Sequence, residues 1–177
     1  MIGKDNKYDA VIVGAGVSGL FMFYKLRNMG LSVLVIEKSD ELGGTWNWNR
    51  YPGARCDIPS LEYSYQFDED LQQEWNWSEK YSAGPEILEY LNHVAEKFDL
   101  KDYINFEEEV IQAKFNEDSC LWSVSTNKQK YVAKFCIFAT GCLSIPNKPE
   151  IPGLESFEGK LLHTATWPRE EQNFTDK

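Results

Sequence analysis

The sequence has 177 residues, of which 42% are apolar and 26% charged, and this balance predicts a folded globular domain rather than a disordered segment. Its 28 acidic residues outnumber its 18 basic residues, and the net charge of -10 disfavours a nucleic-acid partner. No apolar run approaches the roughly 18 to 20 residues of a membrane span, and no secretion signal opens the chain, so we expect a cytoplasmic protein without membrane contact.

The first 37 residues predict a β-α-β unit. The apolar run over 8–13 is typical of a strand buried in a parallel sheet, and it ends at Gly14. Apolar residues then recur with helical spacing over 17–24, and Gly30 stands where that helix should end. The run over 32–36 supplies the second strand, and the crossover that joins the two strands should be right-handed.

The rest of the chain predicts loops, one helix and a small sheet. Between residues 42 and 84 no periodicity persists, and we expect loops that cover a ligand. A helix over 85–98 follows. The strands expected next form an antiparallel meander over 104–106, 110–115, 121–125 and 131–132. A further buried strand over 135–139 ends at Thr140 and Gly141, after which three prolines mark a linker.

Three glycines between the first strand and the first helix indicate a dinucleotide. Gly14, Gly16 and Gly19 form the pattern GxGxxG, which in this context brings helix N–H groups to a pyrophosphate. Glu37 closes the second strand, where its carboxylate can accept hydrogen bonds from ribose hydroxyls. Because that carboxylate would repel a 2′-phosphate, the site favours FAD or NAD over NADP. The alternative is a glycine-rich turn without a ligand.

The loop after the second strand distinguishes FAD from NAD. A simple nicotinamide dehydrogenase continues there into another βα unit, whereas residues 41–46 form a Gly-Gly loop with an aromatic residue. Here the sequence resembles the two-dinucleotide-binding flavoproteins, and residues 138–141 resemble their second signature. The resemblance implies an α/β fold: a Rossmann-like FAD-binding domain with a parallel sheet, helices and a small antiparallel β-meander, incomplete in this chain.

Two further segments narrow the resemblance to one branch of flavoproteins. Residues 49–57 are similar to the flavin-facing loop of Baeyer-Villiger monooxygenases, and a second segment matches their fingerprint FxGxxxHxxxW(P/D). The fingerprint residues are Phe157, Gly159, His163, Trp167 and Pro168. Trp167 favours this branch over the flavin-containing monooxygenases, which usually carry Tyr or Phe there. The resemblance covers residues 8–177.

The resemblance implies an activity that depends mainly on the cofactor. In this family NADPH reduces FAD, oxygen adds to form a flavin peroxide, and one oxygen atom enters a ketone to give an ester or lactone. The implied partners are a small ketone or sulfide substrate and molecular oxygen, while the sequence predicts no oligomeric state. The alternatives are a flavin-containing monooxygenase that acts on amines or sulfides, and a non-catalytic FAD-binding fragment.

The resemblance also implies which residues serve the cofactor. Asp57 would be the catalytic residue, placed beside the isoalloxazine and acting with an arginine of the nicotinamide domain. The other residues expected along FAD are Gly14, Gly16, Val17, Ser18, Gly19, Glu37, Lys38, Gly44, Thr45, Trp46, Tyr63, Val110, Ala139, Thr140 and Gly141. For His163 and Trp167 we favour the anchoring of a linker over a direct chemical role.

The expected domains are an FAD-binding domain over 1–142 and a linker over 143–177 that leads to an NADPH-binding domain absent from this chain. No second GxGxxG follows the fingerprint, so we expect the N-terminal part of a longer protein, not competent for catalysis alone. The acidic run over 107–109 is interpreted as a solvated edge. Four cysteines without paired spacing and two histidines predict no metal site.

Overall fold

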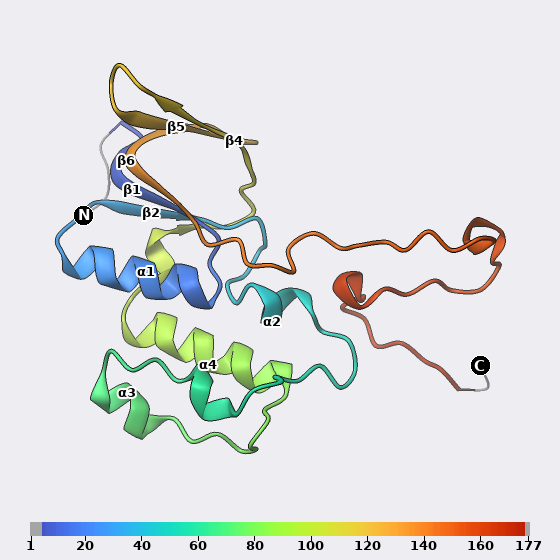
Figure 1. Cartoon of the computed structure of the whole chain (residues 1–177). Helices are drawn as coiled ribbons and strands as arrows, with labels where there is room; N and C mark the ends of the chain where they lie inside the picture. Colours follow the sequence, from blue (N-terminus) through green and yellow to red (C-terminus); the bar gives the residue numbers. More distant parts are fainter. Residues whose placement is uncertain (1–4, 176–177) are drawn as a thin grey trace.

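A computed structural model describes residues 5–175 and contains one six-stranded sheet with helices on one side (Figure 1). The predicted β-α-β unit is confirmed as β1 (Lys7–Val13), α1 (Val17–Asn28) and β2 (Val33–Ile36). Gly30 follows the helix with a left-handed φ of 81°. The other elements are α2 (Thr45–Trp48), α3 (Glu69–Glu74), α4 (Gly84–Lys97), β3 (Ile104–Asn105), β4 (Val110–Asn116), β5 (Leu121–Thr126) and β6 (Lys130–Phe138).

The strand order is β3-β2-β1-β6-β5-β4, so β1 lies inside the sheet. The pairs among β3, β2, β1 and β6 are parallel, whereas β4 and β5 pair antiparallel and continue the sheet beyond β6. The predicted meander is therefore confirmed for β4, β5 and β6. It is wrong for the strand expected over 104–106, because β3 pairs parallel with β2 at the opposite edge of the sheet. The meander and the β-α-β unit belong to the same sheet.

Two expected strands, over 131–132 and 135–139, are one strand in the structure. β6 pairs antiparallel with β5 at its start and parallel with β1 through to Phe138. The prediction of a buried strand over 135–139 is wrong for Phe135 and Phe138, which are each 57% exposed. The polar residue Lys134 separates two apolar runs in the sequence, and this break predicts a strand end. In the structure the pairing of β6 with β1 continues past Lys134.

The sheet separates two hydrophobic cores, because successive side chains of a strand point to opposite faces. Val33 and Val35 of β2 pack in the core shared with α1 and α4. Leu34 and Ile36 of the same strand pack in a second core with residues of β5 and β6. Burial on both faces explains why β2 is apolar throughout. Figure 1 shows α1 and α4 below β1 and β2, and the β4-β5 hairpin above them.

The prediction of only loops over 42–84 is wrong for three short segments: α2, a 3-10 turn over Ser60–Tyr63, and α3. Segments of four to six residues are too short to show a helical period in the sequence. α3 nevertheless had a visible signal, because Asp68 precedes it and accepts a hydrogen bond from the N–H of Leu71 at 2.8 Å.

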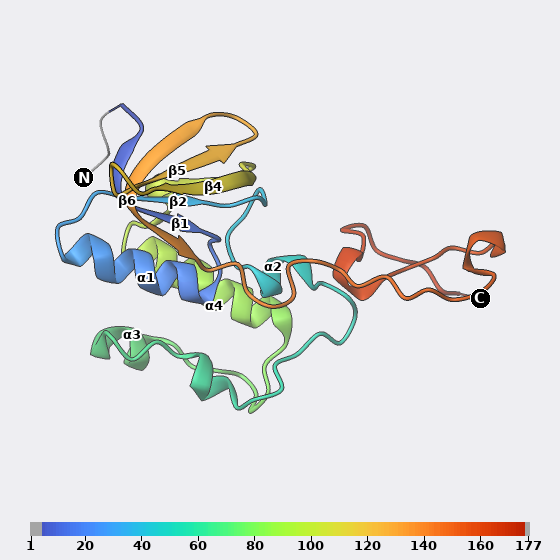
Figure 2. The same ribbon diagram turned by 45° about the horizontal axis from the view of Figure 1, so that its top comes forward.

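The residues after β6 leave the sheet as an extended arm with two 3-10 turns, Leu154–Ser156 and Thr164–Thr166 (Figure 2). The arm then returns towards the loop between β2 and α2, where Arg169 forms an ion pair of 2.5 Å with Asp40. Within residues 5–175, no helix combines the length and apolar character that crossing a membrane requires.

Candidate functional site

The carboxyl ends of three parallel strands lie side by side at one edge of the sheet. Val13 at the end of β1 pairs with Ile36 of β2 on one side and with Phe138 of β6 on the other. In open α/β sheets, ligands bind outside these ends, where the chain continues to opposite sides of a central strand. The candidate site is therefore formed by the loops that follow β1, β2 and β6.

Two of the predicted glycines allow close packing between β1, α1 and β6. A Cβ atom on Gly14, whose φ is 106°, would lie 2.6 Å from the carbonyl oxygen of Ala139. A Cβ atom on Gly19 would lie 1.9 Å from the carbonyl oxygen of Gly14. Only glycine fits either position without a shift of the backbone. Ala139, Thr140 and Gly141 therefore start directly beside the glycine loop, with Thr140 and Gly141 exposed.

The remaining glycine of the motif, Gly16, faces the Gly-Gly loop that follows β2. A Cβ atom on Gly44 would lie 3.0 Å from the Cα atom of Gly16, and Gly44 has a positive φ of 54°. The N–H of Gly43 donates to the carbonyl oxygen of Ala15 at 3.0 Å. The two loops thus meet through backbone atoms, with no side chain between them.

The N-terminus of α1 lies where the glycine loop meets the Gly-Gly loop, and no side chain of the described residues accepts a hydrogen bond from its first backbone N–H groups. Gly16 is the N-cap residue and forms no side-chain cap, and the first turn carries no acidic residue. A helix N-terminus without a cap presents N–H groups and partial positive charge, which favour a phosphate. Val17 is half-buried and Ser18 exposed at this end. The residues present fit the pyrophosphate of a dinucleotide.

Glu37 lies at the end of β2 and is only 5% exposed. One carboxylate oxygen accepts a hydrogen bond from the N–H of Ala15 at 2.7 Å, and the other accepts from the N–H of Ser39 at 2.8 Å. Each carboxylate oxygen can accept a further bond. The backbone therefore holds this carboxylate against the glycine loop, in a position that suits the predicted contact with ribose hydroxyls. Its neighbour Lys38 is exposed and forms an ion pair with Glu109.

A second group of predicted residues lies on the α2 side of the junction. Trp46, on α2 directly after Thr45, contacts Tyr63 edge-to-face, with 5.5 Å between ring centroids. Burial raises the pKa of the Tyr63 phenol, and the charges of Cys56 and Asp57 raise it further. Asp57 itself is exposed. Tyr63 thus lies beside Trp46 and within reach of the charge of Asp57.

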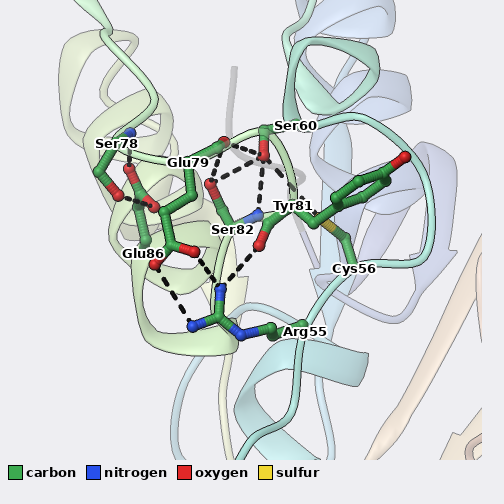
Figure 3. Close-up of polar contacts among 8 residues, drawn as sticks. All are labelled: Arg55, Cys56, Ser60, Ser78, Glu79, Tyr81, Ser82 and Glu86. Carbon is green, nitrogen blue, oxygen red and sulfur yellow. Dashed lines mark hydrogen bonds and ion pairs between the residues drawn. The ribbon is translucent and has the colours of Figure 1, made fainter.

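A polar cluster that the sequence analysis did not predict holds the segment that contains Asp57 in place (Figure 3). Ser60 Oγ accepts a hydrogen bond from the N–H of Ser82 and lies 2.8 Å from the carbonyl oxygen of Glu79. Arg55 donates to the Glu79 carboxylate at 2.6 Å and to the carbonyl oxygen of Tyr81 at 2.8 Å. These contacts hold residues 55–60 against residues 79–82, just before α4. Serines in a loop carry no periodic signal, so no pattern could have found them.

The prediction of a solvated edge over 107–109 is wrong for Glu108, whereas Glu107 is exposed. Glu108 is 2% exposed and accepts hydrogen bonds from three side chains. Glu107 has a positive φ of 53°, and this turn of the backbone allows the next side chain to point inward. Val110, which was predicted to lie beside the adenine, follows at the start of β4 and packs against the second core.

The fingerprint residues make their contacts mainly within the arm. His163 Nδ1 accepts from the N–H of Ala165, and its Nε2 lies 3.2 Å from the carbonyl oxygen of Asn147. A Cβ atom on Gly159 would lie 2.4 Å from the ring of Phe157. Both contacts of His163 lie within the arm, and its anchoring role stays a prediction. Half-buried Trp167 and Pro168 precede Arg169, and Trp167 lines an open cavity of about 520 Å³ with Trp48 and Lys38.

Comparison with known proteins gives relatives over nearly the whole chain. The profile of the pyridine nucleotide-disulphide oxidoreductase family matches residues 11–175. Acetone monooxygenase (methyl acetate-forming) of Gordonia sp. is 44% identical over 170 residues, which are 96% of this chain and 32% of that protein. Baeyer-Villiger monooxygenase of Pseudooceanicola batsensis is 43% identical over 169 residues, 94% of this chain and 31% of that protein.

A solved structure agrees with these relatives. Cyclohexanone monooxygenase from Rhodococcus sp. Phi1 bound to NADP⁺ matches with a TM-score of 0.89 and 46% identity, over 96% of this chain and 32% of that one. The predicted resemblance to Baeyer-Villiger monooxygenases and the predicted Rossmann-like fold are confirmed. The chain spans about a third of the length of these relatives.

Proposed function

This chain belongs to the pyridine nucleotide-disulphide oxidoreductase family, and from that membership we propose that it is the FAD-binding part of a Baeyer-Villiger-type flavoprotein monooxygenase. The observation that carries the proposal is the junction of Gly16 and Gly44 at the uncapped N-terminus of α1. Backbone N–H groups meet there without Cβ atoms between them, as the pyrophosphate of a dinucleotide requires.

Each predicted residue has a place in this proposal. Gly14 and Gly19 would let the loop approach the cofactor, and Gly16 and Gly44 would face the pyrophosphate. Glu37 would accept hydrogen bonds from the ribose. The remaining residues would line the adenine end or the flavin end: Val17, Ser18, Lys38, Thr45, Trp46, Asp57, Tyr63, Val110, Ala139, Thr140 and Gly141.

When bound, FAD supplies the transfer of electrons from NADPH to molecular oxygen, which protein side chains cannot perform. The residues of this chain would bind and orient it. The edge-to-face pair of Trp46 and Tyr63 would exclude water from one side of the flavin end. A phenol is protonated at neutral pH, and the raised pKa of Tyr63 only extends this range, so its hydroxyl can donate a hydrogen bond. Asp57 would contribute a negative charge beside it.

For the whole protein we propose insertion of one oxygen atom from O₂ into a small ketone, giving an ester or lactone. NADPH would bind to segments outside this chain, beyond a linker that we place at 143–177 after an FAD-binding domain over 1–142. The location that we propose is the cytoplasm. Trp167 in the fingerprint supports ketone oxidation over the oxidation of amines or sulfides by a flavin-containing monooxygenase.

Titration with FAD tests the first part of this proposal. We expect saturable binding of one FAD per chain, measured as quenching of flavin fluorescence. In a parallel titration, NADP⁺ should not compete with FAD for this site. The Glu37→Gln variant keeps the size of the side chain and removes its charge, so it should bind FAD more weakly. Absence of saturable FAD binding by the folded wild type would overturn the proposal.

Product analysis tests the second part, with the protein that carries this chain supplied with NADPH, oxygen and a mixed panel of ketones and sulfides. We expect NADPH consumption that depends on ketone, with one ester or lactone formed per NADPH. Sulfoxide without ester would favour the flavin-containing monooxygenase alternative. FAD binding without any turnover would favour the non-catalytic alternative.

A further inference from the structure

Glu108 joins parts of the sheet that the strand order keeps apart. Its carboxylate accepts a hydrogen bond from Asn105 of β3 at 3.0 Å. It also accepts from Thr126 at the end of β5 at 2.6 Å and from the hydroxyl of Tyr131 in β6 at 2.9 Å. β3 is an edge strand, separated from β6 by β2 and β1 in the ladder. One carboxylate thus bridges the two sides of the curved sheet.

The backbone of the same residue contacts the candidate cofactor site. The N–H of Glu108 donates to the carbonyl oxygen of Glu37 at 2.9 Å, and the N–H of Glu37 donates to the carbonyl oxygen of Asn105 at 2.9 Å. The Glu37 carboxylate accepts from the N–H of Ala15 in the glycine loop. A continuous hydrogen-bonded path therefore runs from Tyr131 through Glu108 and Glu37 to the glycine loop.

A buried carboxylate is costly, and apolar residues of similar volume usually serve stability as well or better. Within residues 5–175, no cation forms an ion pair with Glu108, and its partners are neutral donors. These partners fix the orientation of the Glu108 carboxylate, because a carboxylate bonded to three donors can adopt few orientations. The backbone that follows Asn105 and contacts Glu37 is therefore held in one position.

We propose that Glu108 is a positioning residue for the adenosine end of the cofactor site. Its carboxylate holds the loop after β3, and through that loop it orients Glu37 towards the ribose. This inference rests on the proposed function, because it takes Glu37 as the residue that binds the ribose. It assigns Glu108 an effect on ligands that contain adenosine and none on ligands that lack it.

The experiment compares wild type and Glu108→Gln by titration with ADP, FAD and FMN. Glutamine preserves the volume but places an amide donor opposite another donor, either the Asn105 amide or the Thr126 hydroxyl. We expect the Kd for ADP and for FAD to rise about tenfold, which corresponds to about 1.4 kcal/mol. FMN has no adenosine, so its Kd should stay the same. Glu117→Gln, in the exposed β4-β5 turn, is the matched control and should change none of the three constants.

The outcomes separate this inference from the proposed function. A wild type that binds neither FAD nor ADP overturns both. If the wild type binds both ligands and Glu108→Gln binds them with the same Kd as the wild type, only the role of Glu108 is overturned. The same conclusion follows if Glu108→Gln loses as much affinity for FMN as for FAD. If Glu108→Gln does not fold, Thr126→Val removes one donor from the carboxylate while keeping the shape of the side chain. That variant should weaken ADP and FAD binding without affecting FMN, and unchanged constants in it would also overturn the inference.

Discussion

A Cβ atom on Gly19 would lie 1.9 Å from the carbonyl oxygen of Gly14. A Cβ atom on Gly16 would lie 3.4 Å from the Cα atom of Gly44 and 3.8 Å from its nitrogen, distances close to ordinary contact. Two glycines of one motif thus have different tasks. Gly19 allows the helix to pack against the strand, whereas Gly16 leaves space beside the helix N-terminus.

Gly19→Ala should therefore destabilise the fold. The added methyl group would force the backbone of α1 away from β1, and overpacking of this kind costs about 1–3 kcal/mol or more. Thermal unfolding followed by circular dichroism measures the loss. Ser18→Ala, at the exposed neighbouring position, should leave the midpoint nearly unchanged. Equal midpoints for Gly19→Ala and wild type would show that α1 does not pack as described.

Gly16→Ala should leave the fold intact and weaken FAD binding. Its methyl group has room against Gly44 but would occupy the space where a pyrophosphate approaches the backbone. We expect at least a tenfold rise in the Kd for FAD, with a midpoint of thermal unfolding within a few degrees of wild type. Retained affinity in a folded Gly16→Ala variant would mean that the phosphate site lies elsewhere.

Ser82→Ala should loosen the segment that carries Asp57. Ser82 is fully buried, and its hydroxyl lies 2.8 Å from Ser60 Oγ in the polar cluster of Figure 3. Loss of a buried hydrogen bond costs about 1–2 kcal/mol. Hydrogen exchange of the amides over 55–60 should accelerate. In the control Ser78→Ala, which removes an exposed hydroxyl bonded to Glu86, exchange over 55–60 should be unchanged.

The stability of the protein should fall in acid partly through Asp9. Hydrogen bonds from Lys134 and from Ser32 hold the pKa of the Asp9 carboxyl well below its usual range. Its contribution is therefore present above the unfolded pKa of about 3.9 and is lost as the pH falls through the lower folded pKa. Urea unfolding of wild type and Asp9→Asn should differ by about 1–2 kcal/mol at pH 7 and converge towards pH 2. A constant difference over this range would contradict the assignment.

Alkaline pH should destabilise the fold through Tyr131. Burial, and then the hydrogen bond to Glu108 and its charge, raise the pKa of this phenol to about 12. A phenol with a raised pKa contributes stability below the unfolded value of about 10, and this contribution is lost as the pH rises towards 12. NMR of tyrosine labelled at Cζ measures the titration, with Tyr131→Phe to assign the signal. In Glu108→Gln the same signal should titrate at a lower pH.

The elements that the sequence predicted well depend on neighbours in the chain. The strand and helix of the β-α-β unit follow from apolar spacing within 30 residues, and Gly14, Gly16 and Gly19 stand directly between them. The fingerprint from Phe157 to Pro168 is likewise a local pattern, and it led to the same relatives that comparison found. For such features, the residues that decide the structure are the residues that carry the signal.

What only the tertiary structure decided are contacts between distant segments. β6 is one strand because β1 and β5 pair with it from opposite sides, although its sequence is interrupted at Lys134. Glu108 is buried because Tyr131 and Thr126 reach it across the curved sheet, and Ser60 is buried because Ser82 meets it. A charged or hydroxyl side chain is stable inside a protein only where donors and acceptors face it, and folding alone brings those partners together.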